Sequence, residues 1–303
     1  MADKGPLKGQ VGLFAIADPS AEVRAAVSSR HEGVAVTADW RELLGKVDLV
    51  SICSPAITHY EIVKAFLNAG AHVLVEKPIA TSREEAADLL AIVKETGRIL
   101  TVGHQERFVF ARTGLLDLDA IPLEITCWRQ GPWTGRGDDV SAALDLMIHD
   151  LDLVHTLVPG PVAAVTARGF VEYGPFADEI SATVTFAGGT VVQLETSRVA
   201  ATRKRGLRAV YADGIVEIDF LSRVVINTTP RPLLVQENGG VFEMGDPLSE
   251  SVAGFVAAAR GAAPVLVTAQ QAAQALDTAL LIEEAAGVSQ PLPVAERRVA
   301  AAG

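Results

Sequence analysis

The sequence has few cysteines, fewer positive than negative charges and no long apolar run. Each of these features excludes some classes of protein or partner. Its 303 residues include two cysteines, Cys53 and Cys127, in unrelated segments that form no metal or redox motif, so a reducing cytoplasm is expected. The formal net charge of −11 argues against nucleic acid and anionic membrane as partners. No apolar run approaches the roughly 20 residues that a membrane-spanning helix needs.

What is present has the composition of a soluble globular protein. Hydrophobic residues make up 49% of the chain and charged residues 21%, and the length allows two domains, each with its own core. The first residues, Met1–Pro6, lack the apolar core of a signal peptide.

Up to residue 104, short apolar runs alternate with segments that have the spacing of helices. The runs are apolar almost throughout, as parallel strands covered on both faces are, and lie at Leu13–Ala17, Val47–Cys53, His72–Val75 and Ile99–Val102. The helical segments between them are Ala21–Ser29, Ile57–Ala69 and Ser82–Thr96. This alternation predicts a doubly wound, Rossmann-like α/β unit over residues 1–104.

Beyond residue 104 the pattern becomes that of an α+β unit, residues 105–303. One long helix is predicted at Ser141–Val158, and two more close the chain at Leu248–Arg260 and Ala269–Ala286. Segments of alternating polarity, separated by turn dipeptides such as Gly188-Gly189, lie at Ile180–Phe186, Val191–Thr196, Leu207–Tyr211 and Val216–Phe220. These segments predict an open antiparallel sheet with one packed face.

Lys77 stands where an open α/β sheet binds its ligands. It follows the buried run His72–Val75, and Pro78 restricts its backbone. The alternative is an exposed loop lysine, the commonest environment of this residue type. Asp18 ends the first apolar run, where a carboxylate either accepts the ribose hydroxyls of an adenosine or caps the following helix.

The turn after the second apolar run lies at the same edge of the sheet. Ser54 and Pro55 start it, and Thr58 and His59 fall in the first turn of the next helix. Backbone N–H groups there can hold the pyrophosphate or the nicotinamide ribose of a dinucleotide. The alternative is an ordinary connection between a strand and a helix.

A narrow polar stripe runs along the predicted helix Ser141–Val158. It lies within an arc about 60° wide and consists of Asp145, His149, Asp152 and Thr156. Asp145 and His149, one turn apart, are expected to interact, which raises the basicity of the imidazole. The stripe favours an active-site face, with a buried structural network or a metal pair as alternatives. Asp150 points into the apolar arc and is expected to be a buried structural acid.

Ahead of this helix runs a loop rich in glycine and proline, Trp128–Val140, with two tryptophans and two arginines. Trp133 suits the face of a sugar ring and Arg136 suits a phosphate, while a surface loop with stacked arginine and tryptophan side chains is the alternative. A second basic group is expected to be a solvated face, and consists of Arg198, Arg203, Lys204, Arg205 and Arg208.

Taken in order, five motifs resemble those of the glucose–fructose oxidoreductase / inositol dehydrogenase family, Gfo/Idh/MocA. They are Ala17-Asp18-Pro19, Ser54–His59, Glu76-Lys77-Pro78, Gly103–Phe108 and Asp145–Asp150. The resemblance implies an NAD-dependent oxidoreductase, with NADP less favoured, that acts on a secondary hydroxyl of a sugar. It also implies assembly as a homodimer or homotetramer.

Residue by residue, the resemblance implies three groups of site residues. The catalytic set is Lys77, Asp145 and His149, with His149 taking the hydroxyl proton, Asp145 orienting it and Lys77 polarising the developing carbonyl. The cofactor contacts are Asp18, Ser54, Pro55, His59, Glu76 and Lys77. The expected sugar contacts are Arg107, Trp133, Arg136 and His149. No metal is expected.

A narrower similarity concerns the loop and the helix after it. Arg129-x-Gly131-Pro132-x-x-x-Arg136, followed by Leu144–Asp150, is similar to the UDP-N-acetylglucosamine 3-dehydrogenases within the family. This similarity implies a nucleotide sugar as the substrate.

One element that the resemblance implies is not found in the sequence. The family opens with a strand, a Gly-x-Gly-x-x-Gly turn and a helix, but only 17 residues precede Asp18, and they hold no such turn. We therefore expect a Rossmann-like sheet without its first strand and helix, through a misplaced start codon or a real loss, and weak NAD binding. The alternative function is a non-catalytic sugar-binding or regulatory relative that has lost the cofactor.

Overall fold

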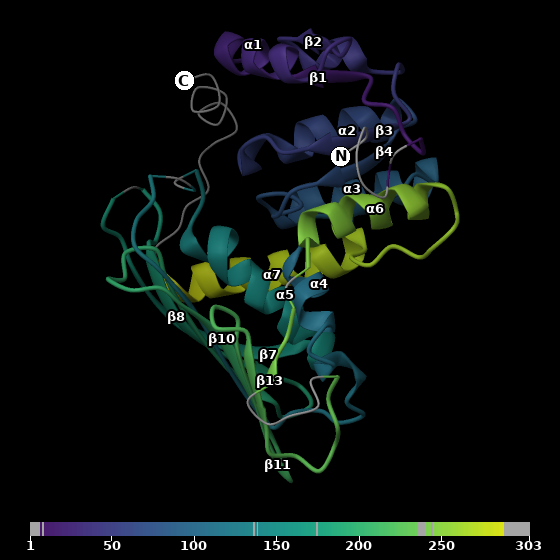
Figure 1. Cartoon of the computed structure of the whole chain (residues 1–303). Coiled ribbons are helices and arrows are strands. Elements are labelled where there is room, and N and C mark those ends of the chain that lie inside the picture. The colour runs from purple at the N-terminus through teal and green to yellow at the C-terminus, as the bar shows by residue number, and fades with distance from the viewer. Residues whose placement is uncertain are drawn as a thin grey trace.

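The computed structural model describes residues 7–287 with the exception of 8, 136, 138, 174, 235–239 and 244. Within this range the chain forms two small parallel sheets in its first hundred residues and one large mixed sheet after them (Figure 1). Among the described residues, no helix is both long enough and apolar enough to cross a membrane.

The strands of the first hundred residues fall into two separate parallel sheets. One consists of β1 (Ala15–Ala17) and β2 (Ala35–Thr37), and the other of β3 (Leu49–Ile52), β4 (His72–Val75) and β5 (Leu100–Val102). The helices of this region are α1 (Ala21–Arg30), α2 (His59–Asn68) and α3 (Arg83–Thr96). The predicted Rossmann-like alternation is confirmed, with β2 as a strand that the sequence patterns missed.

Local sequence explains where these helices begin and end. The Ser82 hydroxyl accepts the backbone N–H of Glu85 at 3.2 Å and caps α3, which ends at Gly97 with a left-handed φ of 64°. On α2, Val63 and Phe66 belong to an apolar face that is buried against the β3–β5 sheet. In contrast, α1 buries none of its residues.

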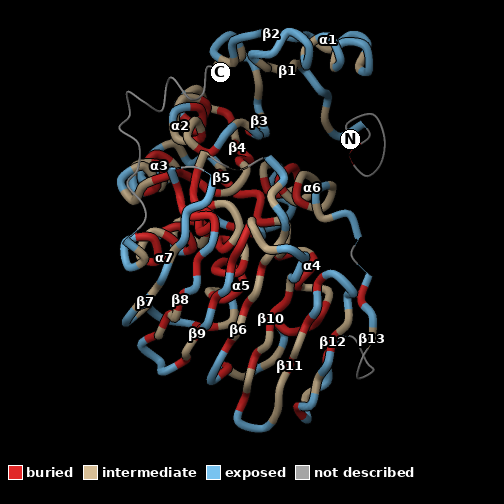
Figure 2. Tube along the Cα trace, turned by 90° about the vertical axis from the view of Figure 1, so that its left-hand side faces the viewer, coloured by how far each residue is buried: buried red, intermediate tan, exposed pale blue. Residues whose placement is uncertain are grey.

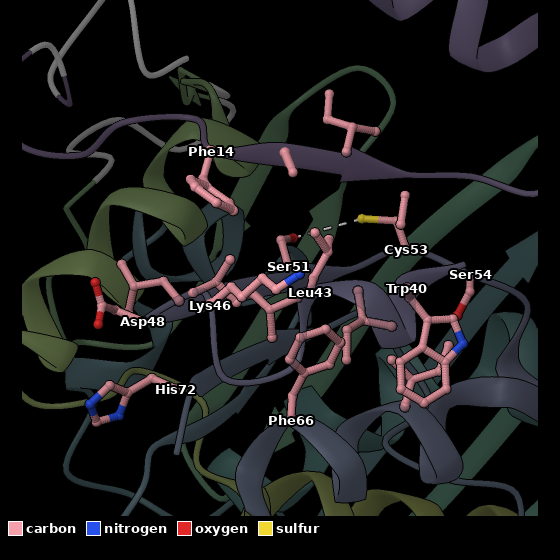
Figure 3. Close-up of a pocket in the computed structure, with 18 of the residues that line it drawn as sticks. Phe14, Trp40, Leu43, Lys46, Asp48, Ser51, Cys53, Ser54, Phe66 and His72 are labelled. Atoms are coloured by element: carbon pink, nitrogen blue, oxygen red, sulfur yellow. Dashed lines mark hydrogen bonds between the residues drawn. The ribbon is translucent and has the colours of Figure 1, made fainter. Parts of the chain in front are cut away.

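A cleft of about 1790 Å³ separates the two parallel sheets. Figure 3 shows Phe14 on the β1 side of this cleft, with Ser51 and Phe66 on the other side. In the described part of the chain, β1 pairs only with β2 and β3 only with β4, so each has an unpaired edge. The described chain therefore has a gap in its Rossmann-like region where β1 and β3 face each other without hydrogen bonds between them.

The large sheet has the strand order β13-β12-β11-β10-β6-β9-β8-β7. Its strands are β6 (Glu124–Gln130), β7 (Val162–Phe170), β8 (Glu179–Phe186), β9 (Val191–Ser197), β10 (Lys204–Tyr211), β11 (Gly214–Asp219), β12 (Val224–Asn227) and β13 (Gly240–Val241). The predicted open sheet is confirmed, but β6 and β9 run parallel, so it is mixed rather than antiparallel throughout. The reason is that a helix and a hairpin, not a tight turn, connect these two strands.

Helices cover one face of this sheet and join the two halves of the molecule. α7 (Ala269–Ala286) contacts β7, α5 (Ile148–Leu157) and α3, and Arg83 on α3 donates to Asp277 and Glu284 on α7. Figure 2 shows the buried residues gathered around α5, α7 and the adjoining strands. The remaining helices are α4 (Glu106–Ala111), α6 (Pro247–Ala259), a π-helix at Ala143–Met147 and short 3₁₀ turns at Trp40–Leu43, Ala56–Thr58 and Leu115–Asp117.

Candidate active site

Lys77 and Asp145 bring the two halves of the chain together. Lys77 follows β4, and its Nζ donates to Asp145 Oδ1 at 2.7 Å and to the backbone carbonyl of Asp145. The two side chains are 18% and 24% exposed, so the pair is partly accessible to solvent rather than enclosed in the core. A half-buried ion pair of this kind keeps an ammonium group in a fixed position.

The π-helical turn Ala143–Met147 explains why Asp145 faces Lys77 and not His149. A π turn bonds i to i+5, so residues four apart no longer lie on one line as they do in an α-helix. The expected Asp145–His149 interaction is therefore corrected to Lys77–Asp145. π turns are frequent at functional sites, which fits this placement.

His149 lies just beyond the π turn with an imidazole that is neutral at pH 7. Burial, followed by the charges of Lys77 and Arg129, holds the pKa of His149 well below its ordinary value of 6.5. Its Nδ1 is buried without a hydrogen-bond partner among the described residues. The ring of His104, itself buried, meets that of His149 edge-on, with centroids 6.1 Å apart. A neutral imidazole in this position is able to accept a proton.

Two arginines near the proposed helix are buried in ion pairs. Arg107, a predicted sugar contact, donates to both oxygens of Asp152, at 2.7 and 2.8 Å, and is 4% exposed. Arg129, on β6, pairs with Asp150 at 2.7 Å. The expectation that Asp150 is a buried structural acid is confirmed. Guanidinium groups with both carboxylate oxygens in reach are held in place and unavailable to a substrate.

The predicted turn at the second apolar run is held together by His59. Its Nδ1 lies 2.7 Å from the carbonyl of Pro78 and its Nε2 2.9 Å from the carbonyl of Ser54. With both nitrogens engaged and the residue 1% exposed, His59, a predicted cofactor contact, ties Pro78 to Ser54. The Thr58 hydroxyl donates to Ser54 Oγ at 2.7 Å, and Pro55 starts the 3₁₀ turn beside the cleft.

Asp18 and Glu76 both lie at strand ends on the cofactor side of the molecule. Asp18 lines the cleft and accepts the N–H of Ser20 at 2.8 Å, while Ser20 and not Asp18 caps α1. Glu76 accepts from Gln105 at 3.1 Å, and burial raises its pKa. A Cβ at Gly103 would lie only 2.9 Å from the Glu76 carboxylate, so this close approach requires glycine.

The loop before the π turn reaches both sides of the site. Asp139 Oδ2 accepts the N–H of Ala56 at 3.0 Å, and the backbone of Gly137 packs against the Asp145 carboxylate with no room for a side chain. Trp133 stacks on Tyr173, and Arg136, a predicted sugar contact, lies outside the described residues.

The expected solvated face of basic residues is wrong for two of its members. Arg198 is 5% exposed and pairs with Asp178 at 2.6 Å, and Arg205 pairs with Glu106 at 3.1 Å. Their partners are distant in sequence, and no local pattern indicated them.

The residues present fit NAD in part. Asp18 and Ser54 line the cleft at the ends of β1 and β3, and Glu76 directly follows β4, at the edge of an α/β sheet where ligands usually bind. However, the connections after β1, β3 and β4 in the described chain contain no glycine, so no glycine-rich turn offers its N–H groups to a pyrophosphate there.

Comparison with known proteins supplies the family. Residues 7–104 match the model of an oxidoreductase family with an NAD-binding Rossmann fold, and residues 120–217 match the GFO/IDH/MocA C-terminal domain. UDP-N-acetylglucosamine 3-dehydrogenase from Acidithiobacillus ferrooxidans is 30% identical over 80% of this chain and 80% of its own. The chain belongs to the Gfo/Idh/MocA family of oxidoreductases.

Solved Gfo/Idh/MocA structures share the fold along most of the chain. The structure of the same Acidithiobacillus ferrooxidans enzyme superposes with a TM-score of 0.80 at 28% identity, covering 89% of this chain and 88% of that one. Inositol 2-dehydrogenase from Rhizobium meliloti is a further relative, 26% identical over 74% of this chain and 70% of its own. Membership of this family makes the protein an enzyme.

Proposed function

We propose that this Gfo/Idh/MocA enzyme transfers hydride between NAD and a secondary hydroxyl of a nucleotide-linked sugar. The observation that carries the proposal is a half-buried, neutral His149, with an enclosed Nδ1, next to the Lys77–Asp145 pair. The names of the relatives support a sugar substrate, and UDP-N-acetylglucosamine is the first candidate.

The chemistry follows from the protonation of these three residues. His149 acts as the base, and because Nδ1 is enclosed, Nε2 takes the hydroxyl proton. The Lys77 ammonium has three N–H groups, and Asp145 engages two of them, which leaves the third without a partner among the described residues and able to polarise the substrate oxygen. Asp145 positions Lys77. When bound, NAD supplies the hydride acceptor.

On the cofactor side, Asp18, Ser54, Pro55 and Glu76 would hold the two riboses. A carboxylate at Asp18 accepts ribose hydroxyls and repels a 2′-phosphate, which favours NAD over NADP. We also propose a division into domains after residue 104, assembly into a homodimer or homotetramer through the open face of the large sheet, and a cytoplasmic location.

Turnover of UDP-N-acetylglucosamine with NAD, followed by absorbance of NADH, tests the proposal. Replacing His149 with Ala is expected to lower kcat by about 10²–10⁴-fold while sugar binding is retained. The matched control is His31→Ala, on the α1 layer away from the site. Equal turnover of the His149→Ala variant and the wild type would refute the role of His149 as the base.

A further inference from the structure

An aromatic pair near the proposed reaction centre has no part in the chemistry described above. Trp133 and Tyr173 stack with ring centroids 5.2 Å apart and planes 21° apart. Tyr173 is 56% exposed and Trp133 is half-buried. An exposed, stacked aromatic ring offers its open face to a planar ligand.

Two buried charges fix this pair in place. Asp178 Oδ2 accepts the backbone N–H groups of Glu172 at 2.7 Å and Tyr173 at 2.8 Å. Its Oδ1 accepts from Arg198 Nε at 2.6 Å, and the Arg198 guanidinium lies over the Trp133 ring, 5.3 Å from its centroid. Because both rings are held before any ligand arrives, binding to them loses little conformational entropy.

The segment that carries Trp133 leads directly to the proposed catalytic residues. Arg198 also donates to the carbonyl oxygens of Gly137 and Val140, farther along the same segment. Gly137 in turn packs against the carboxylate of Asp145. The aromatic pair is therefore coupled to the reaction centre through Arg198 and Gly137.

Positive charge lies at the connection between β9 and β10 and at the start of β10. A Cβ placed on Gly131, two residues before Trp133, would lie 3.5 Å from Arg203 Cγ, so the Arg203 side chain lies beside this segment. Arg205 is 37% exposed at its side chain, and its charge acts on His149. An aromatic face beside guanidinium groups is the combination that recognises a base and its phosphates.

We infer that Trp133 and Tyr173 form a subsite for the nucleobase of a nucleotide-linked sugar, with the phosphates directed to Arg203 and Arg205. The inference rests on the proposed function and adds the part of the substrate that is remote from the reacting hydroxyl. Binding energy from such a remote group helps to orient the reacting one.

Calorimetric titration of the full chain with uridine 5′-diphosphate tests this subsite without any turnover. Tyr173→Ala is expected to weaken binding about tenfold or more, whereas Tyr173→Phe keeps the ring face and the affinity. The matched control is Phe170→Ala. Phe170 is 55% exposed, as Tyr173 is, but its ring stacks on no other ring among the described residues. Circular dichroism checks that each variant is folded.

The outcomes separate this inference from the proposed function. Unchanged affinity in a folded Tyr173→Ala variant overturns the subsite, and so does a wild type that fails to bind the diphosphate, even if it oxidises a free sugar. Binding that depends on Tyr173, together with no turnover of any nucleotide sugar, supports the subsite and rejects the proposed oxidation.

Discussion

The two walls of the cleft between β1 and β3 differ in how completely they are packed. On the β3 side, Val63, Phe66 and Val73 are at most 1% exposed. On the β1 side, α1 buries no residue, and Phe14 is 57% exposed. One wall is an ordinary protein core, and the other is a layer with little apolar burial to hold it.

This difference separates the residues proposed for chemistry from Asp18, one of the residues proposed for the cofactor. Lys77 and Asp145 are joined across β4 and the π turn, and Asp145 contacts Gly137 on the loop ahead of it. None of these contacts involves β1, α1 or β2. The geometry of the proposed catalytic pair therefore does not depend on the loosely packed wall, whereas the position of Asp18 does.

The first prediction tests the packed side. Replacing Lys77 with Ala removes the ammonium that polarises the substrate oxygen and should lower kcat by about 10²–10³-fold. The control is Lys64→Ala, which breaks an exposed ion pair with Asp88 on α2 and α3. Steady-state rates of both variants give the comparison, and similar rates for the two would leave Lys77 without a catalytic role.

The second prediction compares the two walls directly through their phenylalanines. Phe66→Ala should lower the free energy of unfolding by about 3–5 kcal/mol, because it leaves a cavity in a closed core. Phe14→Ala should change it by no more than about 0.5 kcal/mol, because the ring is mostly in solvent. Urea unfolding measures both. A comparable loss in the two variants would show that the β1 wall is packed in solution.

Much of the fold could be predicted because its signal is local. Apolar runs such as His72–Val75 are long enough and uniform enough to read as buried parallel strands. β2, Ala35–Thr37, was not predicted because it has only three residues and none of them is buried. β6 was not predicted either, and one reason is that its last residues, Trp128–Gln130, precede a segment rich in glycine and proline.

The candidate site was harder to predict because its contacts are not local. Lys77 and Asp145 are 68 positions apart, and only the packing of the two halves brings them together. The helical stripe placed Asp145 beside His149 by assuming α-helical spacing, which the π turn breaks. Arg107 had the features of a ligand residue in isolation, and its buried partner Asp152 lies 45 positions away.

The third prediction concerns the loosely packed wall. We expect the 303-residue chain to bind NAD more weakly than with micromolar affinity. The reason is that no glycine-rich turn lies at the described strand ends beside the cleft to receive the pyrophosphate. Calorimetric titration with NAD measures this affinity. Titration of the same sample with UDP-N-acetylglucosamine is the control, because binding of the sugar nucleotide shows that the substrate pocket is intact. Micromolar affinity for NAD would show that another segment completes the site.

The smallest expected effect is a shift in the pKa of His149. Burial is the main cause of its low pKa and the Lys77 charge comes second, so Lys77→Met should raise the pKa only part of the way back towards 6.5. NMR titration of the histidine ring measures it, with Lys64→Met as a control that leaves it unchanged. Because the base must be neutral, wild-type turnover should be level at and above pH 6.5 and decline only when the pH falls through the depressed pKa. A decline that begins above pH 6.5 would mean that the pKa of His149 is not lowered, and would remove the ground for making it the base.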